Sequence, residues 1–330
     1  MDVSVLVMDD VADLGLAAVL ETFAVANSLR GTLAAPPPPW RVRTVSIAGS
    51  VRSGNGYTIP TVPVADPGAP CDETQGPAVL IVPAINVLDA PSLTTRISLA
   101  ENSPVLELIR GAHSRGVHIA GACTGTFFLA EAGVLDGRAA TTSWWLGPAF
   151  RRRYPAVALN EALTLCRTPA VTTAGASLSH VDLALSLIQL VSPALAEKAA
   201  RYLVVGSGRA QAGHIVPEVM AHGNSLVAAF ERWVRHRLGE QFRIAAAARE
   251  LGVTERSLQR ATQSELGMSP RDFVHDIRLE HAAYLLRTTS LSLEAIAARV
   301  GYLNAGTLRN LVRRRREMSI AQLRATPGLR

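Results

Sequence analysis

Among the residues that could carry chemistry, Cys123 lies in the segment Gly121–Gly125, where a buried apolar run is expected to turn sharply into a helix. Its small neighbours permit a tight elbow, and a helix N-terminus there would favour the thiolate form of the cysteine. Nucleophilic or redox chemistry at Cys123 is therefore one hypothesis. The other is an inert cysteine packed as a small hydrophobic residue, and the local spacing favours neither.

Two segments of the second half share a layout that is typical of a helix-turn-helix. In each, an apolar stripe at helical spacing ends at a glycine, Gly252 or Gly301, and a second helix follows near Thr254 or Ala305. The second turn is one residue longer. The stripes are formed by Ile244, Ala248 and Leu251, and by Leu293, Ile296, Ala297 and Val300. The pattern predicts two helix-turn-helix units joined by a linking helix over residues 270–287.

Polar side chains at the start of each second helix are expected to meet the edges of DNA bases. Arginine can bind guanine through two hydrogen bonds, and glutamine can bind adenine in the same way. The candidates are Arg256, Ser257, Gln259 and Arg260 in the first unit, and Thr307, Arg309, Asn310 and Arg313 in the second. Leu258 and Ala261 are predicted to turn inward. Residues 314–316, all arginines, are predicted to contact phosphates.

The charge distribution favours a polyanionic partner for the second half only. Residues 1–210 hold 15 Lys and Arg against 16 Asp and Glu, and residues 211–330 hold 18 against 11, so the net charges are −1 and +7 and give the total of +6. Such asymmetry is typical of a neutral domain joined to one that binds nucleic acid.

In the first half, strand-like and helical patterns alternate. Strands are expected within residues 3–8, 41–49, 78–84 and 116–123, and helices over 14–29, 103–116 and 125–137. This order predicts an α/β domain of the flavodoxin-like kind, with a parallel sheet covered by helices on both faces. We expect three parts: an α/β domain over 1–205, a Gly-rich linker over 206–224 and an all-α domain over 225–330.

Composition excludes several classes of protein. Hydrophobic residues at 48% and charged residues at 18% are globular proportions. The longest apolar stretches are shorter than the roughly 18 residues of a membrane span, and the N-terminus has no secretory signal pattern. Three cysteines, Cys71, Cys123 and Cys166, fit neither a disulfide framework nor a zinc motif. A cytoplasmic protein without metal, cofactor or membrane partner is expected.

The segments GACTGTFFLAEAGVLDGRAATTSWW, FRRRYP and TTAGASLSHVDLAL resemble the class I glutamine-amidotransferase-like (PfpI-like) domain of GlxA-type transcriptional regulators, over roughly residues 1–205. The resemblance implies a histidine after ATT that would activate the cysteine in hydrolytic members. Here that position is Ser143, which cannot act as a general base at neutral pH. The remaining crevice could bind a small ligand or serve dimer contacts. Its candidate residues are Cys123, Thr124, Ser143, Trp144 and His180.

The second half resembles the AraC/XylS family of DNA-binding domains over roughly residues 225–328. The match includes ARELGVTERSLQRATQSELGMSPRDFVHDIRLEHAAYLLRTTSLSLEAIAARVGY and TLRNLVRRRREMS. It implies two recognition helices in adjacent major-groove segments on one face of double-stranded DNA. The ending REMSIAQLR departs from the family pattern, because it lacks the usual aromatic-Gly and Ser-Pro elements.

These observations predict a sequence-specific transcriptional regulator, a homodimer controlled through a non-catalytic PfpI-like domain that responds to a small-molecule effector. Two alternatives remain open. One is a cysteine-dependent hydrolase or redox sensor that uses Cys123. The other is a nonspecific DNA binder, which would show a steep salt dependence and a small specificity ratio.

Overall fold

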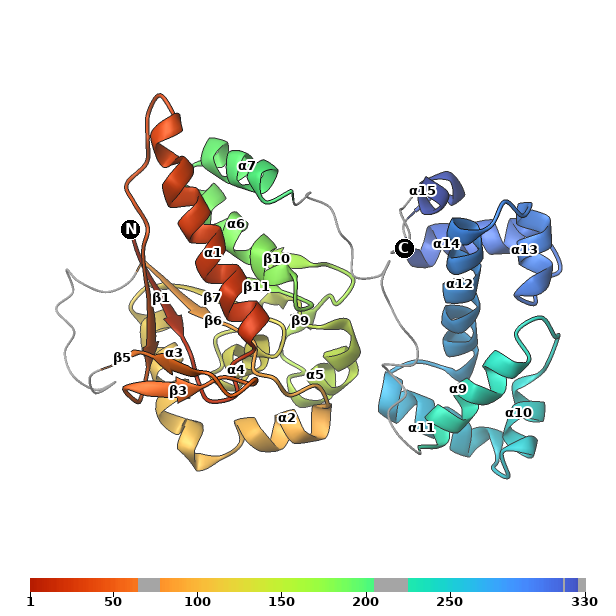
Figure 1. Cartoon of the computed structure of the whole chain (residues 1–330). Coiled ribbons are helices and arrows are strands. Elements are labelled where there is room, and N and C mark those ends of the chain that lie inside the picture. The colour runs from red at the N-terminus through yellow and green to blue at the C-terminus, as the bar shows by residue number, and fades with distance from the viewer. Residues whose placement is uncertain (65–77, 205–224, 317, 326–330) are drawn as a thin grey trace. The chain divides into compact units, whose positions relative to one another are not determined.

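The computed structural model describes residues 1–64, 78–204, 225–316 and 318–325, and it divides the chain into two compact units, Met1–Gln211 and Ala212–Arg330 (Figure 1). The linker expected at 206–224 lies outside the described residues. Each unit is considered by itself.

Unit 1 is built on a mostly parallel sheet. In its described part, seven strands run in the order β10-β11-β7-β6-β1-β2-β5, and every neighbouring pair is parallel except β10 with β11. The strands are β1 (Asp2–Leu6), β2 (Arg41–Ser46), β5 (Val62–Pro63), β6 (Val79–Val82), β7 (His118–Ala122), β10 (Leu165–Arg167) and β11 (Val171–Ala174). Two small ribbons pair β3 (Ser50–Arg52) with β4 (Thr58–Pro60), and β8 (Ala139–Ala140) with β9 (Ala158–Leu159).

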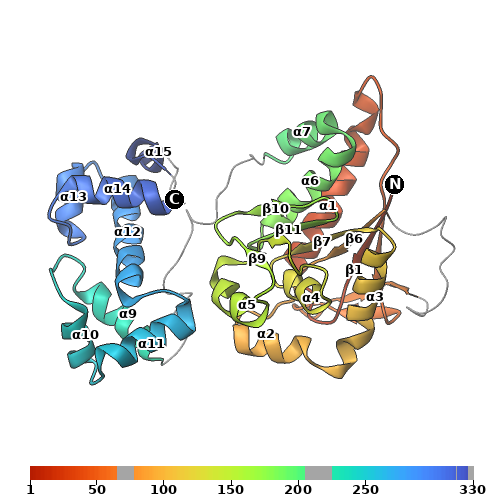
Figure 2. The same ribbon diagram turned by 180° about the vertical axis from the view of Figure 1, so that it is seen from behind.

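Helices cover both faces of this sheet, as the two opposite views show (Figures 1 and 2). One layer contains α1 (Asp13–Leu29), α6 (Ser179–Val191) and α7 (Pro193–Tyr202). The other contains α2 (Ala90–Ile97), α3 (Ser103–Ser114), α4 (Gly125–Glu131) and α5 (Gly147–Arg153). Short 3-10 turns occur at η1 (Arg30–Thr32), η2 (Ala100–Asn102) and η3 (Trp144–Leu146).

Two separate apolar cores follow from the alternation of side chains along each strand. In β6, Val79 and Ile81 join the core beneath α1 and α6, whereas Leu80 and Val82 join the core beneath α3 and α4. A strand buried on both faces therefore reads as a continuous apolar run. The expected α/β class is confirmed.

The sequence located the long elements better than the short ones. The helix expected over 125–137 ends at Glu131 in the structure, because Gly133 adopts a left-handed φ of +76° that terminates it. The strands β3, β4, β5 and β8 to β11 are two to four residues long, and the sequence pattern did not predict them.

Unit 2 is helical throughout its described part and contains both expected helix-turn-helix units. The first is α10 (Ile244–Glu250) with α11 (Glu255–Leu266), and the second is α13 (Leu293–Arg299) with α14 (Ala305–Arg316). They are preceded by α9 (Leu226–His236), joined by α12 (Pro270–Thr288) and followed by α15 (Ile320–Ala325). The second turn is one residue longer than the first, as predicted.

Caps and glycines define the ends of these helices. The hydroxyl groups of Thr254, Ser269 and Ser292 each accept a hydrogen bond from the amide three residues ahead, at the starts of α11, α12 and α13. Gly252 and Gly301 have φ values of +71° and +76° in the two turns. A glycine is favoured at both positions because side chains disfavour this conformation.

Gly125, at the start of α4, lies against the end of β6. A Cβ atom there would lie 2.3 Å from the carbonyl oxygen of Val82 and 2.6 Å from that of Pro83. We expect Gly125→Ala to lower the free energy of unfolding of unit 1 by at least about 2 kcal/mol, since backbone oxygens cannot move aside. Denaturant titration followed by tryptophan fluorescence measures this. Gly31→Ala is the control, because its Cβ would meet nothing within 4 Å, and equal transitions for the two variants would contradict the close approach.

Candidate nucleic-acid interface and cysteine elbow

Cys123 forms the expected elbow between β7 and α4. Its φ is +55°, a left-handed conformation that costs free energy for a residue with a side chain. Hydrogen bonds hold it there: its amide donates to Ala174 O at 2.8 Å, and its carbonyl accepts from the hydroxyl of Thr142 at 2.8 Å. The backbone of a nucleophile elbow is therefore present.

The partner of the Cys123 sulfur is Ser143. The Ser143 hydroxyl donates a hydrogen bond to Cys123 Sγ at 2.8 Å, and both side chains are buried. Burial raises the pKa of the Cys123 thiol above its ordinary value, and hydrogen bonds from Ser143 and the Thr124 amide offset this only in part. The thiol is therefore protonated at neutral pH, and the residue facing it cannot remove the proton.

Two further pocket candidates, Thr124 and Trp144, are also buried. The Thr124 hydroxyl accepts from the amide of Ile85 at 2.8 Å and donates to its carbonyl at 2.9 Å, which ties the elbow to the chain after β6. Trp144 packs edge-on against Trp145, with ring centroids 5.4 Å apart. Both residues contribute to the frame around Cys123.

His180 is buried at the start of α6, and main-chain groups occupy both of its ring nitrogens. Nδ1 donates to Ser177 O at 2.6 Å, and Nε2 accepts from the amide of Ala84 at 3.2 Å. Burial lowers the pKa of His180 to about 4. Gly15 on α1 lies so close that a Cβ there would be 2.6 Å from Nε2. His180 is therefore a neutral cross-link between the start of α6 and the chain after β6, with no nitrogen left to act as a base for Cys123.

Acidic residues that follow β1 organise neighbouring loops. Asp9 accepts from the amide of Arg52 at 2.8 Å, and Asp13 accepts from the amide of Asn55 at 3.0 Å. A hydrogen bond from the Ser53 side chain lowers the pKa of Asp13. These carboxylates hold the β3–β4 ribbon at the end of β1.

The folded state keeps His180 neutral, so its depressed pKa predicts a loss of stability in acid. The unfolded state takes up a proton near pH 6.5, whereas the folded state does so only near pH 4. The free energy of unfolding should therefore fall by about 3 kcal/mol between these values on account of His180. Denaturant titrations of wild type and His180→Asn across this range isolate the contribution. Parallel pH profiles for the two proteins would contradict it.

A buried, protonated thiol predicts low reactivity. In the native protein we expect Cys123 to react with iodoacetamide at pH 8 at least about ten times more slowly than in denaturant. Ser143→Ala should slow the reaction further, because it removes a hydrogen bond that favours the thiolate. Peptide mass spectrometry measures each site, with Cys166, whose pKa burial also raises, as the internal reference. Fast labelling of Cys123 that titrates below pH 7 would restore the nucleophile hypothesis.

The first recognition helix, α11, presents an exposed polar face. Arg256, Gln259 and Arg260 are exposed, and Ser257 is half-buried beside its cap, Thr254. Leu258 is fully buried as predicted.

Ala261, which was predicted to turn inward, lies at the edge of the buried stripe rather than within it. Ala261 is half-buried, and the fully buried residue is Thr262, which donates to Leu258 O at 3.1 Å. The buried stripe repeats every four residues and continues to Leu266. A polar threonine can occupy it because a carbonyl group of the same helix accepts a hydrogen bond from its hydroxyl group.

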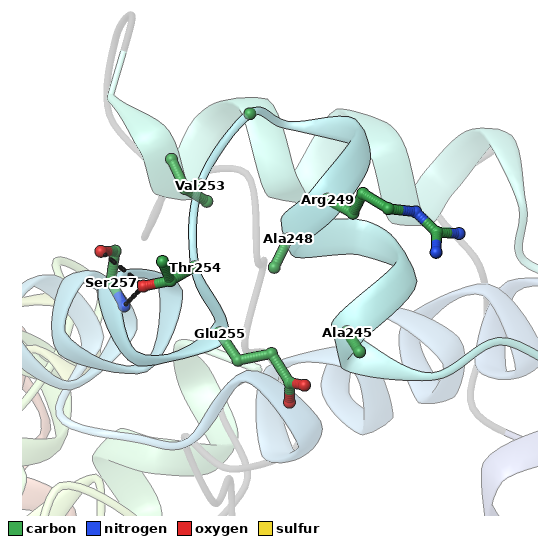
Figure 3. A pocket seen from close by; sticks show the side chains of 8 residues that line it. Ala245, Ala248, Arg249, Val253, Thr254, Glu255 and Ser257 are labelled. Carbon is green, nitrogen blue, oxygen red and sulfur yellow. Dashed lines mark hydrogen bonds between the residues drawn. The ribbon is translucent and has the colours of Figure 1, made fainter.

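An open hollow lies at the turn between α10 and α11 (Figure 3). Ala245 and Ala248 contribute only methyl groups to it, which leaves room beside the turn. In the same view, Thr254 bonds to both the amide and the hydroxyl of Ser257. The small residues and this cap fix where α11 begins.

The second recognition helix, α14, repeats the arrangement. Thr307, Arg309, Asn310 and Arg313 are exposed, while Leu308 and Val312 are buried. Asn304 caps the helix by accepting from the amide of Thr307 at 2.8 Å and from its hydroxyl at 3.1 Å. This cap was not predicted, although Asn three residues before Thr is a recognisable signal in the sequence.

Arg315 is half-buried and already paired with carboxylates, which argues against its predicted phosphate contact. Its guanidinium pairs with the carboxylates of Asp272 and Asp276 on α12, the latter at 2.7 Å. The hydroxyl of Ser269, and then Arg315, lower the pKa of Asp272. Position 315 is seven residues after the buried Leu308 and shares its side of the helix. Arg314 is exposed, and the side chain of residue 316 lies outside the described part.

Within the described residues, no helix is long and apolar enough to cross a membrane. No group of three or more His, Cys, Asp or Glu side chains in the same residues could hold a metal ion. Cys123 and Cys166 are free thiols.

A mostly parallel α/β unit followed by two helix-turn-helix units in a basic helical unit defines a two-part DNA-binding protein. The family described as "Helix-turn-helix domain" matches residues 247–326. The HTH-type transcriptional regulator CdhR of Pseudomonas aeruginosa is 28% identical over 322 residues, covering 96% of this chain and 89% of CdhR. The regulator GlxA of Rhizobium meliloti is 27% identical over 243 residues, 69% of this chain and 72% of GlxA. The protein is a homologue of these HTH-type transcriptional regulators.

One solved structure supports the fold of the first unit. A putative transcriptional regulator from Vibrio parahaemolyticus matches 62% of this chain and 98% of its own length, with a TM-score of 0.50 and 17% identity. At that identity the likeness shows the fold alone.

Proposed function

We propose that the protein regulates transcription by binding specific DNA sequences through α11 and α14. The observation that carries this proposal is the matched exposure of polar residues at the starts of two recognition helices, each held by a buried apolar stripe. Arginine, glutamine and asparagine at such positions match the hydrogen-bonding groups of the major groove. The homology to HTH-type transcriptional regulators supports the same conclusion.

In this proposal the exposed residues divide into two roles. Arg256, Gln259 and Arg260 read one groove segment, with Ser257 beside them, and Thr307, Arg309, Asn310 and Arg313 read the next. Arg314 contacts phosphates and contributes affinity without sequence preference. Arg315 contributes to neither role, because its charge is paired on α12.

Unit 1 is proposed to act as a non-catalytic sensor and homodimer contact. Ser143 occupies the place where a hydrolase would need its base, and the thiol it faces is buried with a raised pKa. Both nitrogens of His180 are occupied by the main chain. An effector bound by this domain, proposed to span 1–205, would act only if it binds two arrangements of the protein with different affinity.

Specific recognition is tested by selecting bound sequences from a random duplex library at fixed salt. Wild type should enrich a motif with two parts. Arg256→Ala and Arg260→Ala should both relax the part that α11 reads, and each should weaken binding by about 1 to 3 kcal/mol. Arg201→Ala is the matched control, since Arg201 is an exposed arginine on α7 of unit 1. Uniform weakening without relaxed preference would indicate the nonspecific binder. If neither the folded full-length protein nor a folded unit 2 enriches any motif, the proposal is refuted.

A further inference from the structure

The two helix-turn-helix units touch through main chain beside α12. The loop that leads from α9 into α10 lies against the turn between α13 and α14. A Cβ on Gly301 would lie 2.5 Å from the carbonyl of Leu238, and a Cβ on Gly239 would lie 3.2 Å from that of Arg299. Gln241 also donates to Gly301 O. The approach is closer than any side chain at position 301 would permit.

Arg278 of α12 fills the space between these two segments. It is only 7% exposed, and its hydrogen bonds go to carbonyl oxygens: Nη2 to Glu240 O at 2.7 Å and Nη1 to Gly301 O at 3.1 Å. Glu240 belongs to the loop of the first unit, and Gly301 to the turn of the second. The guanidinium therefore bridges both units from the helix that joins them.

Aromatic rings from both sides complete the surroundings of this cation. The Arg278 guanidinium carbon lies 5.0 Å from the ring centroid of Phe242 and 5.5 Å from that of Tyr302. Phe242 precedes α10, and Tyr302 precedes α14. Burial lowers the pKa of Arg278. A buried charge held by carbonyls and rings from two elements restrains both elements at once.

Arg278 also lies at the place from which both recognition helices begin. It lines a cavity of about 700 Å³ together with Glu255 at the start of α11 and with Asn304 and Thr307 at the start of α14. A rocking motion of either unit about α12 would change the separation of these helix starts, and it would also break the contacts of Arg278.

We propose that Arg278 is a positioning residue that fixes the separation of the two recognition helices. It thereby fixes the spacing that the protein accepts between two half-sites, meaning the DNA segments read by α11 and by α14 of one chain. The proposal rests on the DNA-binding function proposed above. One base pair of added spacing moves the second half-site by about 3.4 Å and rotates it by about 34°. A protein with a rigid bridge cannot follow both changes, whereas a protein without the bridge can adapt.

Lysine cannot replace this bridge. The planar guanidinium spans two carbonyls while it stacks on two rings, but an ammonium group is a compact charge that cannot match both geometries. Arg278→Lys keeps the charge and loses the bridge, and Arg278→Gln loses both. Together they separate the effect of geometry from that of charge.

The test uses the full-length chain and the two-part motif that wild type selects, with the half-sites moved by −2 to +2 base pairs. Wild type should lose about tenfold in affinity for each single-base-pair change, as for a mismatched site. Arg278→Lys and Arg278→Gln should bind the different spacings within about threefold of one another while they still prefer the same half-site bases.

The control is Arg237→Gln. Arg237 also lies over an aromatic ring, that of Trp233 at 4.6 Å, and pairs with Glu250. These contacts join α9 to α10 and do not reach the second helix-turn-helix unit. Its spacing profile should stay that of wild type even if its thermal stability falls. A flattened profile for this variant would show that general loosening, not the bridge, sets the spacing, and would overturn the proposal.

Several outcomes are decisive. If folded Arg278→Lys keeps the wild-type spacing profile, the proposal is wrong, as it is if wild type itself tolerates every spacing. Phe242→Leu removes one of the two rings that hold the Arg278 guanidinium and serves if the Arg278 variants do not fold. A partly flattened profile supports the bridge, and an unchanged one refutes it. If wild type enriches no motif at all, the proposed function fails first, which is a separate result.

Discussion

The helix α12 supplies buried side chains to both helix-turn-helix units, and the proposed DNA-binding surface depends on this shared core. Near its start, Phe273 packs against Phe230 of α9, with ring centroids 6.2 Å apart. From its middle onward, Leu279 and Leu286 join the core formed with α13 and α14. Its 19 residues rise about 28 Å, somewhat less than the roughly 34 Å of one turn of duplex DNA. Neither recognition helix has a complete core without it.

Two kinds of side-chain contact then set how each recognition helix lies on α12. Leu308 and Val312 bury the apolar stripe of α14, and Arg315 extends that contact through carboxylates on α12. In the first helix-turn-helix unit, the buried stripe of α11 makes this contact alone. The stripe is formed by Leu258, Thr262 and Leu266. The polar residues that remain outside are defined by this packing, since a helix that buries one side must expose the opposite one.

The sequence predicted most of the architecture because long periodic patterns carry strong signals. Both helix-turn-helix units, the linking helix and the longer inner strands are where the pattern placed them. The differences concern the short strands, the end of the helix that begins at Gly125, and single positions. Ala261 and Arg315 were assigned by residue type, whereas the helical phase decided their orientation. The bridge at Arg278 joins residues 23 to 38 positions away along the chain, and no local pattern encodes contacts of that kind. Likewise, the partners of His180 include Ala84, 96 residues away.

The ion pairs of Arg315 have a consequence for how the charge of this protein is counted. Four consecutive arginines, 313–316, look like a uniform cationic strip when the sequence is read as a string. In the folded helix, one of them has already exchanged its solvent counterions for Asp272 and Asp276. That charge releases no counterion when a polyanion binds. The number of charges in the strip that can interact with phosphates is therefore smaller than its number of arginines. Part of the basic run therefore holds α14 against α12 instead of facing a polyanion.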